Sequence, residues 1–227
     1  MGNFPYIEIE GNSYEIGFQE GKNFKNRIKN SIECYKRMFM DYSNLKWDRA
    51  KELSKKFIPI ISEYDNNYIE EIKGVADGSN FDFEDILALN CRSELVFVGK
   101  EFDKVDGGCT SIGINEYAGL NGNTYVAHNW DWKTSQKSSM IMMKIKQNDG
   151  KPTIFMVTEA GIIGKTGFNS AGLSVFLNAL STNQAPKGLP LHIAMRKIMD
   201  CETLSEAISA VTKMPLGCCA NFMLGHK

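Results

Sequence analysis

Several features that would place this chain in a class at once are missing from it. The formal net charge is −1 at pH 7, so the composition offers no electrostatic basis for binding nucleic acid or an anionic membrane. No stretch approaches the roughly 18 uninterrupted apolar residues that a membrane-spanning helix needs. The first residues contain neither a basic nor an apolar segment, so we predict no signal peptide and a cytoplasmic location.

The cysteine patterns of metal sites and disulfide frameworks are also missing. The six cysteines match no zinc-ligand spacing and no Cys-x-x-Cys pair. We therefore predict reduced thiols, no metal ion and no cofactor. The adjacent residues Cys218 and Cys219 are expected to be two buried thiols on opposite faces of a strand.

What is present changes character near residue 108. Residues 1–108 carry apolar side chains at helical spacing, and Asn12 with Glu15 forms a capping box at a helix start. Gly74 and Gly78 suit the end of a later helix. Residues 109–180 carry short β-rich runs separated by turn signals, in an order that favours antiparallel hairpins. These runs are 110–114, 124–127, 140–145, 153–157 and 173–177.

Helical patterns return after Gly188, and one more apolar run closes the chain at residues 218–224. This order predicts an α+β fold with helices packed on antiparallel sheets. We expect one structural domain, with a helical segment over residues 1–108 and a nucleophile-bearing β segment over residues 109–227. Because the last run stops in mid-pattern, the sequence suggests a chain truncated at its C-terminus, with an edge strand open to pairing in a homo-oligomer.

Cys109 stands where the first β-rich run begins, directly after Gly107 and Gly108. Glycines adopt backbone conformations that residues with a Cβ resist, so an unusual Gly108–Cys109 peptide can precede the thiol. A thiol in that place can attack the Gly108 carbonyl and cleave the chain, which leaves an amine and a nucleophile on one residue. On this local sequence alone, a buried structural cysteine is the more common interpretation.

The rest of the sequence changes that balance. GCTS at residues 108–111 is followed by HNWDW at 128–132 and by EAGIIGKTGFNSAGL at 159–173. The first half adds EIGFQEG at 15–21 and DILALNCRSE at 85–94. Together these motifs resemble the acyl-coenzyme A:6-aminopenicillanate acyltransferase family, also called isopenicillin N acyltransferases.

The resemblance implies the N-terminal nucleophile fold, an αββα sandwich of two antiparallel sheets between helical layers. It also implies a precursor that cuts itself between Gly108 and Cys109 and then uses Cys109 as its nucleophile. The family's aspartate matches Asp131. The family's asparagine from a later strand, which helps to hold the oxyanion, would lie beyond Lys227.

The residues themselves support the same chemistry. An α-amino group has a pKa of about 7.7–8.0, so its neutral fraction at physiological pH can accept a thiol proton. One hairpin separates Asp131 from Cys109, which would bring the carboxylate beside that amine. Asn178, at the end of a β-rich run, is a candidate oxyanion donor through its backbone or side chain, or else a turn-forming residue. We predict an acyltransferase that moves an acyl group from a coenzyme A thioester or an amide to an amine.

Other interpretations stay beside this one. Water in place of the amine would give an amide hydrolase similar to penicillin V acylases and choloylglycine hydrolases, and a truncated form could be a non-catalytic scaffold. A Cys109–His128–Asp131 triad is disfavoured, because residues three apart on a strand point to opposite faces. A phosphate-binding loop at residues 161–172 is disfavoured by its glycine spacing.

Overall fold

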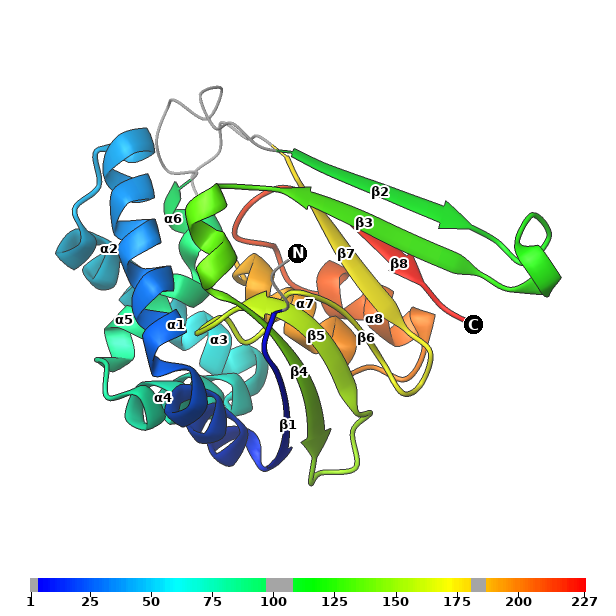
Figure 1. Cartoon of the computed structure of the whole chain (residues 1–227), viewed down its shortest axis with the longest axis horizontal. Helices are drawn as coiled ribbons and strands as arrows, with labels where there is room; N and C mark the ends of the chain where they lie inside the picture. The colour runs from blue at the N-terminus through cyan, green and yellow to red at the C-terminus, as the bar shows by residue number, and fades with distance from the viewer. Residues whose placement is uncertain (1–3, 97–107, 181–186) are drawn as a thin grey trace.

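The computed structural model describes residues 4–96, 108–180 and 187–227 (Figure 1). Its first part is mostly helical, as expected, although it opens with a strand, β1 (Tyr6–Gly11), that the sequence did not predict. The Asn12 capping box is confirmed: Glu15 N donates to Asn12 Oδ1 at 3.0 Å, and Asn12 N donates to Glu15 Oε2 at 2.9 Å. The helices are α1 (Ser13–Ser43), α2 (Trp47–Ser54), α3 (Ile58–Asp65), α4 (Asn67–Ser79), α5 (Phe83–Asn90) and α6 (Arg92–Val96).

The second part contains the five strands predicted between residues 109 and 180, with shifted bounds, the closing run at 218–224 as β8, and one strand that was missed. The missed strand is β6, whose residues the sequence pattern assigned to turns between strands. The strands are β2 (Gly108–Ile114), β3 (Tyr125–Asp131), β4 (Met140–Gln147), β5 (Ile154–Glu159), β6 (Thr166–Asn169), β7 (Ser174–Ala179) and β8 (Ala220–Gly225). Helices α7 (Leu191–Met199) and α8 (Leu204–Thr212) separate β7 from β8.

The strands form a six-stranded sheet in the order β1-β4-β5-β6-β7-β8 and a two-stranded ribbon of β2 and β3. The ribbon lies along β7 and β8 and extends beyond them (Figure 1). Every pairing is antiparallel except that of β1 with β4, which corrects the expectation of purely antiparallel sheets. A parallel pair needs a long crossover, and the helices between β1 and β4 supply it. The α+β class is confirmed.

The longest helix, α1, packs on α4 through glycines. A Cβ on Gly74 would lie 2.1 Å from the carbonyl oxygen of Tyr14, and a Cβ on Gly17 would lie 2.0 Å from that of Glu71. The prediction that these glycines mark a helix end is therefore wrong for Gly74, which lies well inside α4, while Gly78 does lie in the last turn of the helix; both let the two backbones touch. Asn80, in the left-handed conformation at φ 59°, ends the helix instead.

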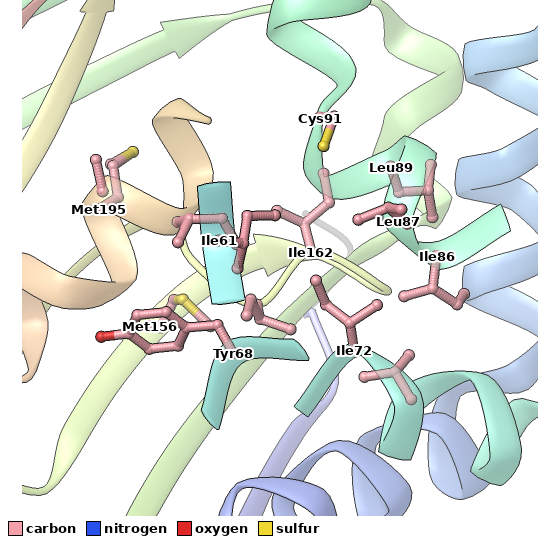
Figure 2. Close-up of a cluster of buried hydrophobic side chains, with 14 of the residues drawn as sticks. Ile61, Tyr68, Ile72, Ile86, Leu87, Leu89, Cys91, Met156, Ile162 and Met195 are labelled. Carbon is pink, nitrogen blue, oxygen red and sulfur yellow. The ribbon is translucent and has the colours of Figure 1, made fainter. Parts of the chain in front are cut away.

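One hydrophobic core joins the helical part to the strands. Figure 2 shows side chains from α3, α4 and α5 meeting others from β5, the loop after it and α7. The labelled residues are Ile61, Tyr68, Ile72, Ile86, Leu87, Leu89, Cys91, Met156, Ile162 and Met195. The division into segments 1–108 and 109–227 stays a prediction, and part of its boundary, including Gly107, lies outside the described residues.

Two further findings concern the surface. All six cysteines are free, but Cys219 is exposed, so the expectation of two buried neighbours is wrong. The pair precedes β8, and only Cys218 turns inward.

Within the described ranges, no helix has both the length and the apolar character needed to cross a bilayer.

We expect Gly74→Ala to destabilise the protein by about 1–3 kcal/mol or more, because the added methyl group would overlap the α1 backbone. Helix propensity alone predicts the opposite sign, a gain of about 1 kcal/mol, so the direction is diagnostic. Urea denaturation measures the change. Lys73→Ala, on the outward face of α4, is the matched control and should leave the unfolding free energy nearly unchanged. A stabilised Gly74→Ala variant would contradict the close contact.

Candidate active site

The register of the β2–β3 ribbon decides which side chains share a face with Cys109. Cys109 lies opposite Trp130, and Ser111 lies opposite His128. Residues directly opposite one another point to the same face of an antiparallel pair. Burial alternates along both strands, and these four residues form the half-buried inner face.

Cys109 lines a pocket of about 140 Å³ between the ribbon and the six-stranded sheet. Two buried cations, Arg92 and Lys165, also line it, together with the aromatic walls Trp130 and Trp132. The Asn178–Ala179 segment of β7 closes another side. The pocket therefore combines a thiol with cationic groups, hydrogen-bond donors and apolar surface.

The surroundings of the Cys109 thiol act in opposite directions. Partial burial raises its pKa above the ordinary value, because a thiolate loses hydration there. The backbone amide of Ala179 and the charges of Lys165 and Arg92 favour the thiolate and lower the pKa, while the charge of Asp131 raises it. The net shift is upward, so the thiol needs a proton acceptor to become a nucleophile.

Asn178 lies inside β7 and is hydrogen-bonded to the ribbon. Ser111 Oγ donates to Asn178 Oδ1 at 2.7 Å, and Asn221 Nδ2 of β8 donates to the same oxygen at 3.2 Å. Both bonds use the oxygen, which leaves the amide group of Asn178 as a donor. The structure thus places Asn178 in the same pocket as Cys109, and its catalytic role stays a prediction.

Asp131 lies beside the Gly108–Cys109 peptide but on the other face of the ribbon from the thiol. It is opposite Gly108, one residue from Cys109, and it belongs to the exposed set of β3 side chains. The backbone register thus places Asp131 beside the start of β2, while its side chain faces away from the pocket of the thiol. Its role also stays a prediction.

His128 shares the inner face with Cys109, whereas Asp131 does not. This alternation matches the argument against a Cys109–His128–Asp131 relay. Burial lowers the pKa of His128, and its ring centroid lies 5.6 Å from that of Phe176. The imidazole is consequently neutral at physiological pH.

A buried ionic network lies directly behind this pocket, and the sequence analysis missed it. Glu159, at the end of β5, is fully buried; it accepts a hydrogen bond from Tyr35 Oη at 2.6 Å and is paired with Lys165. Arg92 Nε lies 3.8 Å from Glu159 Oε1. Lys165 Nζ lies 3.3 Å from the centroid of the Trp130 ring, and Trp130 is the residue opposite Cys109 on the ribbon. The sequence offered one signal for this network, namely that Glu159 and Lys165 are the charged residues in a block, 159–173, that is otherwise uncharged.

The network keeps Glu159 ionised but brings the pKa of Lys165 close to neutral pH. Burial would raise the pKa of Glu159, but Lys165, Arg92 and the hydrogen bonds lower it to about 2. Burial lowers the pKa of Lys165 to about 7, although Glu159 opposes the shift. Glu159 is thus ionised throughout the physiological range and holds positive charge beside the thiol.

The glycines near Lys165 serve packing as well as turns. Gly161, at φ +94°, and Gly172, at φ +87°, lie in turns, as expected. A Cβ on Gly164 would lie 2.0 Å from the carbonyl oxygen of His192, so this glycine lets α7 approach. Because Lys165 is paired with Glu159, the residues do not form a phosphate-binding loop. Among the described residues, no cluster of three or more His, Cys, Asp or Glu side chains could hold a metal ion.

Comparison with known proteins agrees with this geometry. The family model for acyl-coenzyme A:6-aminopenicillanic acid acyl-transferase matches residues 118–227, a range that includes Asp131 and Asn178 and begins after Cys109. The 40 kDa form of acyl-coenzyme A:6-aminopenicillanic-acid-acyltransferase from Emericella nidulans is 32% identical over 91% of this chain and 56% of its own length. The chain belongs to this acyltransferase family.

Two other relatives are less similar to this chain than the Emericella nidulans protein is. A β-alanyl-dopamine/carcinine hydrolase of Drosophila melanogaster is 25% identical over 49% of the chain and 30% of its own length. Protein dcd1A of Dictyostelium discoideum is 21% identical over 96% of the chain and 55% of its own length. The chain thus spans about half the length, or less, of these curated relatives.

We expect Glu159→Gln to destabilise the protein by about 3–5 kcal/mol at pH 7, because Lys165 and Arg92 would remain buried without their counter-charge. The folded pKa of Glu159 lies below its ordinary 4.5. Its stabilising contribution is therefore present above about pH 4.5 and is lost as the pH falls toward 2. Urea denaturation across this range should show a smaller acid-dependent loss in the variant.

Glu8→Gln is the control, because Glu8 also pairs with a lysine, Lys144, but does so on the surface. It should leave both the stability and its acid dependence unchanged. A Glu159→Gln variant as stable as the wild type would contradict the role of this carboxylate as the counter-charge of Lys165 and Arg92.

Proposed function

We propose that this chain is a self-processing acyltransferase that uses Cys109 as an N-terminal nucleophile. The observation that carries the proposal is the position of Cys109: it directly follows Gly108 at the start of β2, and its thiol shares a pocket with two cations and with amide donors of β7. The family to which the chain belongs, and the hydrolase among its relatives, support acyl-group chemistry in general.

Processing comes first. The Cys109 thiol attacks the carbonyl carbon of Gly108, the carbon–nitrogen bond breaks, and the chain is joined through a thioester while the Cys109 nitrogen takes up a proton. Water then cleaves the thioester, which leaves a carboxylate on Gly108, a free thiol and a free α-amino group on Cys109. Among the described residues, a Cβ built on Gly108 would meet no atom within 4 Å, so this glycine lies in an open part of the structure.

Acyl transfer uses the same thiol. The α-amino group accepts the thiol proton, and the thiolate attacks the acyl carbonyl of a coenzyme A thioester or an amide. The Ala179 N–H and the Asn178 amide are the donors for the oxyanion, and Asp131 stabilises the ammonium group. The leaving thiol or amine takes the proton, and an acceptor amine then attacks the thioester on Cys109 and regenerates the enzyme.

This chemistry requires no metal ion and no cofactor, because the thiol and the amine of one residue supply both nucleophile and base. Acyl-coenzyme A enters only as a substrate. Arg92 and Lys165 contribute by favouring the thiolate, since both charges lower the pKa of Cys109.

Amide hydrolysis is the second candidate, and the relative named as a β-alanyl-dopamine/carcinine hydrolase favours it. Both reactions share the acyl-enzyme and differ in whether water or an amine reaches it. Product analysis with and without an added amine acceptor separates them: a new amide product indicates transfer, and free acid alone indicates hydrolysis.

We expect a generic acyl thioester to acylate one cysteine of the protein, and Cys109→Ala to abolish the labelling. Mass spectrometry of peptides locates the label. Cys219→Ala is the matched control, because Cys219 is the more exposed thiol but has no place in the pocket. Labelling that persists in Cys109→Ala and disappears in Cys219→Ala would reject the proposed nucleophile.

A further inference from the structure

A second hollow opens beside the pocket of Cys109. This groove, of about 500 Å³, shares His128, Trp130, Trp132, Lys165 and Thr166 with that pocket, so the two hollows are adjacent. An acyl group bound to the thiol would thus extend from the pocket into the groove. The inference below rests on the proposed function in this respect.

The groove has a largely apolar wall. The rings of Trp130 and Trp132 are stacked, with centroids 5.7 Å apart, and Met140 and Val157 add aliphatic surface. Such a wall binds the apolar part of a ligand, and the few polar groups in it decide which ligand is accepted.

Three polar side chains in the groove lining carry buried atoms with no hydrogen-bond partner among the described residues: His128 at Nε2, Trp132 at Nε1 and Gln136 at both Nε2 and Oε1. Gln136 is only 1% exposed. More than nine in ten buried polar groups are paired, and an unpaired one is destabilising. Gln136 carries both an unpaired donor and an unpaired acceptor.

The backbone around Gln136 is well anchored, so a loose turn does not explain the anomaly. Gln136 lies in a 3-10 turn, η4 (Thr134–Ser138), where its N–H donates to Lys133 O at 2.9 Å. Helix α1 ties the turn down: Arg27 Nη1 donates to Ser138 O at 2.7 Å, and Asn30 Nδ2 donates to Ser135 O at 3.1 Å. The turn is therefore held in place, whereas no hydrogen bond holds the side-chain amide, so only the side chain has to rotate to present the amide to the groove.

Oε1 of Gln136 needs a donor, and Nε2 needs an acceptor. A secondary amide can donate its N–H to Oε1, whereas an ester or a carboxylate can only accept and leaves Oε1 unpaired. A site built around a hydrogen-bonding group discriminates strongly against the analogue that lacks it. We propose that Gln136 selects acyl groups that carry a secondary amide, separate from the reacting carbonyl, within an otherwise apolar chain.

The test compares acyl thioesters that differ in one atom. In each pair, an N-acetylamino group at the end of a short methylene chain is replaced by the acetoxy ester of the same length, and several chain lengths are used. For the best chain length we expect kcat/KM to be about tenfold higher for the amide than for the ester in the wild type. Gln136→Leu should reduce this ratio to about one.

Ser135→Ala is the matched control on the same turn, since its side chain is exposed and does not line the groove. It should retain the wild-type ratio. Thermal unfolding checks the fold of Gln136→Leu, which should be at least as stable as the wild type because an unpaired buried amide is removed. Equal rates for amide and ester in the wild type at every chain length, or an amide preference that survives in Gln136→Leu, would overturn the proposal.

Failure of the proposed function has a different signature, namely that no thioester of either kind acylates the wild type. In that case calorimetric titration of Cys109→Ala with the same pairs tests Gln136 alone, because this variant binds donors without consuming them. Tighter binding of the amide, lost when Gln136→Leu is added, would sustain the proposal, and equal binding of amide and ester would overturn it.

Discussion

The buried carboxylate of Glu159 meets side chains from three other parts of the chain. Tyr35 comes from α1, Arg92 from α6 and Lys165 from the segment before β6. A carboxylate in the interior is tolerated only when it is paired and hydrogen-bonded, so these elements have to converge for the fold to form. Two of the partners, Arg92 and Lys165, also line the pocket of Cys109, which makes the interaction that joins helices to sheet also the source of the site's positive charge.

Buried hydrogen bonds from the helical half also hold the loop that follows Glu159. Glu20 Oε1 accepts from Gly161 N at 2.8 Å, Asn90 Nδ2 donates to Gly161 O at 2.8 Å, and Ile163 N donates to Asn90 Oδ1 at 2.9 Å. These contacts explain why the two motifs of the helical half, at residues 15–21 and 85–94, accompany the block at 159–173. Their polar residues satisfy a buried loop whose own backbone groups have no strand or helix to pair with.

Local signals predicted local structure well. The capping box at Asn12 is present, and the hairpin order predicted the β2–β3 ribbon that carries Cys109. Long-range features escaped prediction. Strand β1 pairs with a strand more than a hundred residues away, and Gly74 looked like a helix end because its partner backbone in α1 cannot be seen in a spacing pattern.

The residues of the candidate site also fall into two groups, those that the sequence predicted and those that it did not. Cys109 and Asp131 could be proposed because their neighbours resemble known motifs, and Asn178 because it stands at the end of a β-rich run. The structure places Cys109 and Asn178 in one pocket, with Asp131 on the ribbon's other face. Glu159 and Lys165 are charged residues in an apolar block, a signal that gains meaning only when burial is known. Gln136 lies in a polar stretch, TSQKS, that reads as surface, and only its unpaired and buried amide distinguishes it.

The most direct test of Cys109 as an N-terminal nucleophile is the intact mass of the purified chain under denaturing conditions, measured beside Cys109→Ala. Self-processing predicts two fragments whose masses correspond to cleavage between Gly108 and Cys109, together with a single uncut chain for the variant. A single uncut chain for the wild type, or the same two fragments from Cys109→Ala, would contradict it.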